Sequence, residues 1–147
     1  MQLEFKSVIT RIRVLNLKER DPYDTFESIK KIHEKNSCRP LFFILLGNYS
    51  KHDKNIASDH PALQNLLREV SLWAEIGIHP SYQTPHNAHV LKSEIKKLNN
   101  LVNQVTVKSR QHFLRILMPK TYTNLLQTTI LEDFRFATRL FLLDSGA

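Results

Sequence analysis

Short runs of apolar residues alternate along the chain with longer stretches in which apolar and polar residues are mixed. Residues 41–46 are apolar at every position, and Gly47 follows them. A short run that is apolar on both faces is typical of a buried strand in a parallel sheet. Shorter apolar runs lie further along the chain. The pattern predicts three strands, near 41–46, 75–78 and 105–109.

Between these runs, apolar residues recur at the spacing of one helix face. Leu63, Leu67 and Val70 form such a stripe, and Pro61 suits the first turn of a helix. The spacing predicts an amphipathic helix within 1–20 and further helices near 22–35, 61–73, 88–102 and 119–129. Helices therefore alternate with strands. This order predicts the α/β class, with parallel strands in a sheet or in one sector of a distorted (β/α) barrel.

Length and composition fit one domain of ordinary size. The chain has 147 residues, of which 41% are hydrophobic and 24% are charged, as in globular proteins. Cys38 is the only cysteine, which excludes an internal disulfide and a cysteine-based zinc cluster. Any metal would have to be bound by histidine and carboxylate side chains.

The net charge of +7 raises the question of a polyanionic partner. The basic residues are scattered, however, and are not interleaved with aromatic residues as in RNA-binding segments. We interpret them as solvated helix faces and expect no nucleic-acid partner. The longest apolar run, 41–46, is far shorter than the ~20 residues that span a bilayer, and the first residues lack the pattern of a signal peptide. We therefore expect no membrane span and a cytoplasmic location.

Three polar clusters each follow a predicted strand. They are residues 48–55, 79–82 and 109–112. The carboxyl ends of parallel strands meet at one edge of a sheet or barrel, where ligands commonly bind. We therefore expect the chemically active side chains of these clusters to converge: Asp53, His79, Arg110 and His112.

Each of these side chains also has a plainer interpretation. His79 precedes Pro80, which favours an extended backbone. Such a histidine binds a divalent metal, acts as a general base, or simply forms a hydrogen bond at a strand end. Arg110 either holds a carboxylate or is a surface residue beside Lys108. Asp53 is equally a site residue or a solvated loop residue.

The segments around these clusters resemble the polysaccharide deacetylase (NodB homology) superfamily, in its bacterial deacetylase-like group. The likeness covers residues 20–134, and five segments within that span carry it. They are Asp21-Pro-Tyr-Asp24-Thr-Phe26, Phe42-Phe-Ile-Leu-Leu-Gly47, Gly77-Ile-His79-Pro-Ser81-Tyr82, Lys92-Ser-Glu94-Ile95 and Ser109-Arg110-Gln-His112-Phe113.

That resemblance implies a distorted (β/α) barrel and a hydrolase of non-peptide carbon–nitrogen bonds that acts on a carbohydrate substrate. Family members use a divalent metal, zinc or similar. The resemblance gives His79 the position of a metal ligand and Arg110 that of the residue orienting the catalytic base. His112 lies near the active face, at a position where the family has proline, and is a further catalytic candidate.

The sequence also departs from the family pattern. Residues 1–20 lack the expected Asp-Asp motif, and Gln83 stands where a second metal-binding histidine is expected. We therefore expect residues 1–147 to be one incomplete domain with weak or no activity. Exposed strand edges of such a domain favour self-association. The alternative is a non-catalytic α/β module, either carbohydrate-binding or degenerate.

Overall fold

The computed structural model describes residues 5–16, 18–135 and 140–141. The chain divides into two units, Met1–Cys38 and Arg39–Ala147. The first unit contains the helices α1 (Phe5–Leu15) and α2 (Phe26–Lys35). Helix α2 begins later than the sequence pattern predicts, because the Asp21 carboxylate and carbonyl accept hydrogen bonds from the Tyr23 and Asp24 amides and close a turn first.

The second unit is built on a five-stranded sheet with the strand order β1-β2-β3-β4-β5. The strands are β1 (Leu41–Ile44), β2 (Glu75–Ile78), β3 (Lys108–Ser109), β4 (Glu132–Asp133) and β5 (Leu140–Phe141). The first four are parallel, and β5 pairs antiparallel with β4. The α/β class and the parallel pairing of the predicted strands are therefore confirmed.

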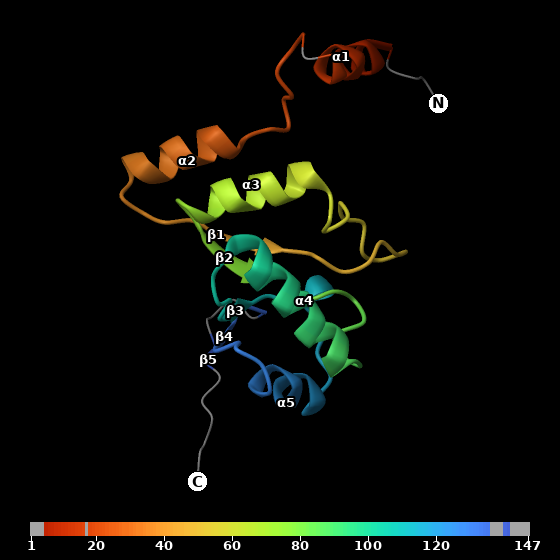
Figure 1. The fold of residues 1–147 in the computed structure, drawn as a ribbon, viewed down its shortest axis with the longest axis vertical. Helices are drawn as coiled ribbons and strands as arrows, with labels where there is room; N and C mark the ends of the chain where they lie inside the picture. The colour runs from red at the N-terminus through yellow and green to blue at the C-terminus, as the bar shows by residue number, and fades with distance from the viewer. Residues whose placement is uncertain (1–4, 17, 136–139, 142–147) are drawn as a thin grey trace. The chain divides into compact units, whose positions relative to one another are not determined.

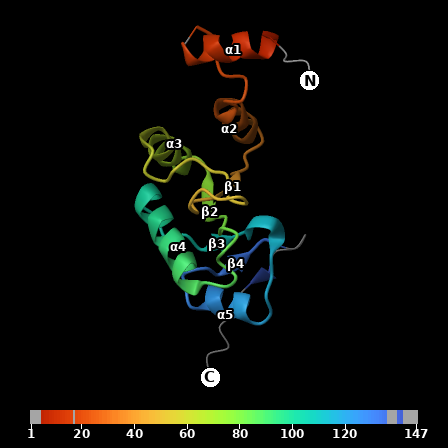
Figure 2. The same cartoon turned by 90° about the vertical axis from the view of Figure 1, so that its right-hand side faces the viewer.

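Helices connect the parallel strands of this unit. They are α3 (Pro61–Ser71), α4 (Ala88–Val102) and α5 (Lys120–Leu126), with a short 3₁₀ helix η1 (His112–Leu114) after β3. Helix α3 packs against α4, and α4 packs on β2, with both helices on one side of the strands (Figures 1 and 2). Among the described residues, no helix is both long and apolar enough to cross a membrane.

The core of this unit lies between α4 and the sheet. Helix α4 buries Leu91, Ile95, Leu98 and Val102, at the spacing of one helix face. These side chains pack in one cluster with residues of the sheet and the other helices, including Leu46, Leu67, Ile78, Leu125 and Ile130. Burial of this apolar face holds α4 in place, and with it the polar side chains near its start.

Gly77 permits close contact between neighbouring strands. It pairs with Phe43 in the parallel register of β1 and β2. A Cβ atom at residue 77 would lie 2.7 Å from the Phe43 ring and 3.0 Å from the Lys108 carbonyl oxygen. A side chain here would force the strands apart, so the glycine keeps β2 close to both neighbours.

Candidate functional site

Backbone hydrogen bonds hold the ends of β1, β2 and β3 together beyond the strands themselves. The His79 amide donates to the Ile44 carbonyl (2.8 Å), and the Arg110 amide donates to the Ile78 carbonyl (3.0 Å). The His112 amide then donates to the carbonyl of Pro80 (3.1 Å). The predicted clusters at 79–82 and 109–112 therefore lie side by side at the carboxyl edge of the sheet.

His79 and His112 form a hydrogen-bonded pair at this edge. Nδ1 of His112 lies 2.9 Å from Nε2 of His79. The outer nitrogens face backbone carbonyl oxygens: His79 Nδ1 contacts the Arg110 oxygen, and His112 Nε2 lies 3.0 Å from the His52 oxygen. Carbonyl oxygens only accept hydrogen bonds, so both outer nitrogens carry hydrogen. A hydrogen bond between the two rings needs a third hydrogen, and the pair carries one positive charge when it holds that hydrogen.

Burial and a neighbouring carboxylate shape the surroundings of the pair. Removal from water lowers the pKa of His79, and the charge on His112 acts in the same direction, while the hydrogen bond to Arg110 opposes them. Asp53 Oδ1 lies 3.8 Å from His112 Nε2, and only 1% of the Asp53 residue is exposed. A buried carboxylate therefore lies beside the outer nitrogen of His112.

Asp53 also connects the loop at residues 48–55 to the loop after β2, which contains His79. Its Oδ1 accepts a hydrogen bond from the Tyr82 amide (2.9 Å), and its Oδ2 accepts one from the Ser50 hydroxyl (3.1 Å). Both carboxylate oxygens thus have donors within the protein. Asp53 joins His79 and His112 at one edge, as the sequence predicts.

Gln111 joins the loop after β3 to the loop after β2, a role that the sequence does not reveal. It is 4% exposed, and its Nε2 donates to the carbonyls of Pro80 (3.0 Å) and Ser81 (2.9 Å). It also exchanges hydrogen bonds with the Thr84 hydroxyl. Because Gln111 directly precedes His112, these bonds fix His112 relative to His79. The sequence shows only a polar residue between Arg110 and His112 and gives no sign of its burial.

Aromatic rings surround the histidine pair. The His52 and Tyr82 rings stack with centroids 4.0 Å apart, and Phe113 meets Tyr82 and His112 edge-on at 5.6 and 4.4 Å. The Arg115 guanidinium lies over the Tyr82 ring, 3.8 Å from its centroid, and donates to the Tyr82 carbonyl. Phe113 nevertheless remains 60% exposed. An exposed aromatic surface therefore adjoins the pair.

Arg110 joins the site through its backbone. Its carbonyl contacts His79, whereas its side chain is exposed. The predicted role of its guanidinium therefore stays a prediction. The rings of His33 and His60 form hydrogen bonds with the Ile29 carbonyl and the Ala62 amide, and the ring of His86 contacts Arg115.

The ring nitrogens of His79 and His112 fit two metal ligands, which is fewer than a full ligand set. Metal-binding histidines usually donate their second N–H to a carbonyl or carboxylate, as His79 and His112 do towards the oxygens of Arg110 and His52. Asp53, however, lies near the outer nitrogen of His112, not between the rings. Within the described part of the chain, no group of three or more His, Cys, Asp or Glu residues is arranged to hold a metal ion.

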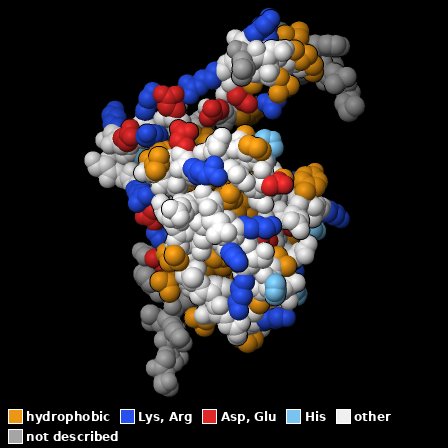
Figure 3. Space-filling view, in the orientation of Figure 1, with side chains coloured by type: hydrophobic (Ala, Val, Ile, Leu, Met, Phe, Trp, Pro, Cys, Tyr) orange, Lys and Arg blue, Asp and Glu red, His pale blue; other side chains and the backbone are white. Residues whose placement is uncertain are grey.

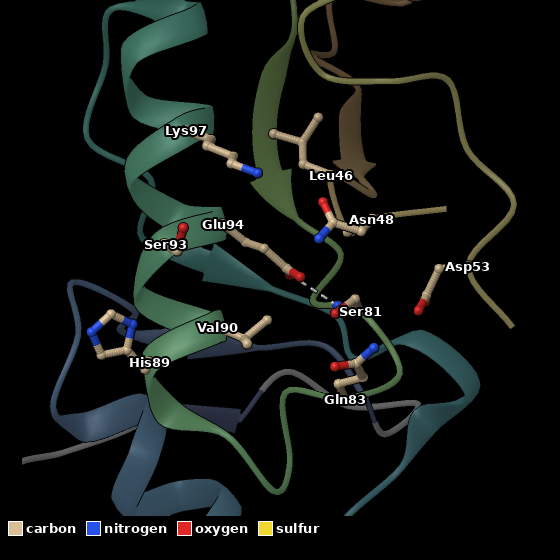
Figure 4. Close-up of a pocket in the computed structure, with 11 residues that line it drawn as sticks. Leu46, Asn48, Asp53, Ser81, Gln83, His89, Val90, Ser93, Glu94 and Lys97 are labelled. Atoms are coloured by element: carbon tan, nitrogen blue, oxygen red, sulfur yellow. Dashed lines mark hydrogen bonds between the residues drawn. The ribbon is translucent and has the colours of Figure 1, made fainter. Parts of the chain in front are cut away.

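A second buried carboxyl group lies close by on α4. Glu94 is 3% exposed, and its Oε2 accepts a hydrogen bond from the Ser81 amide (3.0 Å). Burial raises the pKa of Glu94, and Asp53 adds to this effect, while hydrogen bonds from Ser81 and the charge of Lys97 oppose it. Glu94 lines a cavity of about 200 Å³ together with Asp53 (Figure 4). Sequence analysis noted Glu94 only as part of the family resemblance.

Comparisons with family models, with curated proteins and with solved structures found no match to this chain.

Proposed function

We propose that this chain contributes the metal-binding and substrate-binding edge of a hydrolase that cleaves non-peptide carbon–nitrogen bonds, of the polysaccharide deacetylase type. In this proposal the parallel strands belong to a distorted (β/α) barrel, and the substrate is an N-acetylated carbohydrate. The observation that carries the proposal is the His79–His112 pair, with both outer nitrogens hydrogen-bonded to backbone carbonyls.

In this proposal His79 and His112 bind a divalent ion, zinc or similar, through the two nitrogens that face each other. The bound metal would polarise the amide carbonyl and activate water. The carbonyls of Arg110 and His52 orient the rings, and Asp53 compensates positive charge beside His112. In the same proposal the exposed Arg110 guanidinium orients the catalytic base at this edge of the sheet.

The hydrogen bonds of the pair predict how many protons are released when a metal binds. The free pair holds one hydrogen between His79 Nε2 and His112 Nδ1. A metal bound to both nitrogens replaces that hydrogen, so binding is expected to release one proton at a pH where the pair is charged. Calorimetric zinc titrations in buffers of different ionisation enthalpy measure this number directly.

A non-catalytic carbohydrate-binding module is the second candidate. The observation that favours it is that no third metal ligand accompanies the pair within the described residues, whereas catalytic zinc sites typically use three protein ligands. On this alternative the histidine pair is a structural link between loops, and the edge of the sheet binds sugar without cleaving it.

The test combines zinc binding with release of acetate from an N-acetylated oligosaccharide in added zinc or cobalt. His79→Ala is expected to abolish zinc binding and any turnover. His60→Asn replaces an exposed histidine before α3 with another helix-capping residue and serves as the matched control, with both properties retained. Equal zinc binding by the wild type and His79→Ala would contradict the metal site, and sugar binding without turnover would favour the second candidate.

A further inference from the structure

The cavity beside Glu94 lies between the first half of α4 and the loops that follow β1 and β2. Figure 4 shows Glu94 extending from α4 to Ser81, with Lys97 one turn further along the helix and Asn48 on the opposite wall. Its volume is about 200 Å³. It shares Asp53 with the histidine pair, so the cavity adjoins that pair directly.

The walls of the cavity are held in fixed positions. The Ser81 amide donates to Glu94, and the Ser81 carbonyl accepts from Gln111. Gly47 also forms part of the cavity wall, and a Cβ atom added to it would lie 2.5 Å from Ser81 Cβ and 3.4 Å from Glu94 Oε1. The absence of a side chain at Gly47 thus allows the wall to approach Ser81 and Glu94. The cavity is therefore a formed feature of the fold, not a gap between loosely packed loops.

The lining of the cavity carries groups of opposite charge. Asp53 contributes a negative charge and Lys97 a positive one, and burial raises the pKa of Glu94. An anionic ligand would face Asp53 and Glu94, and a cationic ligand would face Lys97. An uncharged ligand leaves the existing balance unchanged and needs only hydrogen bonds.

The lining offers many hydrogen-bonding groups for such a ligand. Glu94 and Asp53 supply carboxyl oxygens, and Lys97 supplies N–H donors. Hydroxyl and amide side chains supply both donors and acceptors; they are Asn48, Ser81, Gln83 and Ser93. Leu46 and Val90 add a small apolar surface. A mostly polar lining with a small apolar surface suits a ring that carries hydroxyl groups around a carbon frame.

We propose that this cavity binds one uncharged, polyhydroxylated ring of the size of a single sugar unit, next to the His79–His112 pair. The cavity is smaller than the roughly 300–1,000 Å³ of pockets for drug-sized ligands, which restricts the occupant to one ring. This inference rests on the proposed function for the carbohydrate class of the substrate. It deepens that function by placing one unit of the substrate beside α4.

The test uses the metal-free chain and four monosaccharides of similar size: glucose, N-acetylglucosamine, glucosamine and glucuronic acid. Backbone amide shifts in NMR spectra report binding at the cavity, with Gly47, Ser81 and Glu94 as reporters. The neutral sugars are expected to shift these signals with a Kd on the order of 1 mM, as for a small ligand with few contacts. The cationic and anionic sugars are expected to bind at least tenfold more weakly.

Two variants on one face of α4 separate the cavity from general effects. Ser93 is exposed at the cavity rim, so Ser93→Phe fills the cavity without disturbing the core and should abolish the shifts. Asn100 lies seven residues further along the helix, outside the cavity, and Asn100→Phe should leave them unchanged. Absence of binding by neutral sugars, preference for a charged sugar, or binding that survives Ser93→Phe would overturn the inference. Because zinc is absent, these results are independent of the zinc test of the histidine pair.

Discussion

Gln111→Leu offers the sharpest test of how the histidine pair is positioned. The substitution keeps a side chain of similar size and removes the amide that joins the loops after β2 and β3. In the wild type, Gln111 bonds to the carbonyls of Pro80 and Ser81 and to the hydroxyl of Thr84. All three links are lost in the variant.

The size of the effect follows from what each partner retains. The Pro80 carbonyl still accepts from the His112 amide, and the Ser81 carbonyl still accepts from the amide and hydroxyl of Thr84. None of these groups becomes a buried polar group without a partner, so the full desolvation cost does not arise. The two hydrogens of Nε2 are shared among these three acceptors, so the loss of two hydrogen bonds at about 1 kcal/mol each gives an expected loss of about 2 kcal/mol in the free energy of unfolding.

The assay is urea denaturation together with NMR of the histidine side chains. Gln104 is exposed beyond the end of α4, and Gln104→Leu is the control, expected to change stability by less than about 0.5 kcal/mol. In Gln111→Leu the ring nitrogen signals of His79 and His112 should also shift, because their relative position is no longer fixed. A Gln111→Leu protein as stable as the control, with unchanged histidine signals, would refute this account of the site.

Two further substitutions test the sheet and the buried carboxyl group. Gly77→Ala should lower the free energy of unfolding by about 1–3 kcal/mol in thermal or urea denaturation, because the new Cβ would lie 2.7 Å from the Phe43 ring; a neutral effect would contradict the close contact. For Glu94, burial raises the pKa above its ordinary value of 4.5, so the folded state holds the proton more tightly than the unfolded state. The wild type should therefore lose stability relative to Glu94→Gln as pH rises above 4.5, and a difference that stays constant with pH would contradict the raised pKa.

The sequence predicted the first half of the sheet well and its second half poorly. Strands β1 and β2 are marked by apolar runs, and their residues are half-buried in β1 and half-buried or buried in β2. The run at 105–107 is misleading, since Val105 is 68% exposed and the strand is Lys108–Ser109. Strand β4 was missed because it consists of Glu132 and Asp133, and no apolar run marks such a strand.

Buried charge explains why those polar strands lie inside the unit. Asp133 is 1% exposed and pairs with the buried guanidinium of Arg135, and the Ser109 hydroxyl donates to the same carboxylate. The Arg135 guanidinium also lies over the Tyr122 ring. A carboxylate so well paired can be buried. Arg135 lies only two residues from Asp133, but Ser109 comes from a separate part of the chain, and its contact is visible only once the strands are in place.

The residues of the candidate site also divide into those that the sequence predicts and those that it does not. His79 and Asp53 could be predicted because each follows an apolar strand, and His112 because it follows the apolar run at 105–107; the geometry of parallel strands gathers such residues. Gln111 and Glu94 escaped notice because their importance lies in burial and in bonds to the backbone of another loop. A hydrogen bond to a carbonyl or amide depends on where the partner backbone lies, and residue types do not encode that position.

The turn after His112 has a strained backbone. Phe113 and Leu114 both adopt left-handed backbone angles, with φ of 56° and 52°, which costs about 1–3 kcal/mol per non-glycine residue. Phe113 is largely exposed, so burial in the core does not offset this cost; its ring contacts to His52, Tyr82 and His112 do so instead. Backbone strain, a buried carboxylate and a hydrogen-bonded histidine pair therefore coincide at one edge of the sheet, where β1 and β2 end. Departures from the regular apolar pattern that gather in one place are expected of a functional site rather than of a purely structural one.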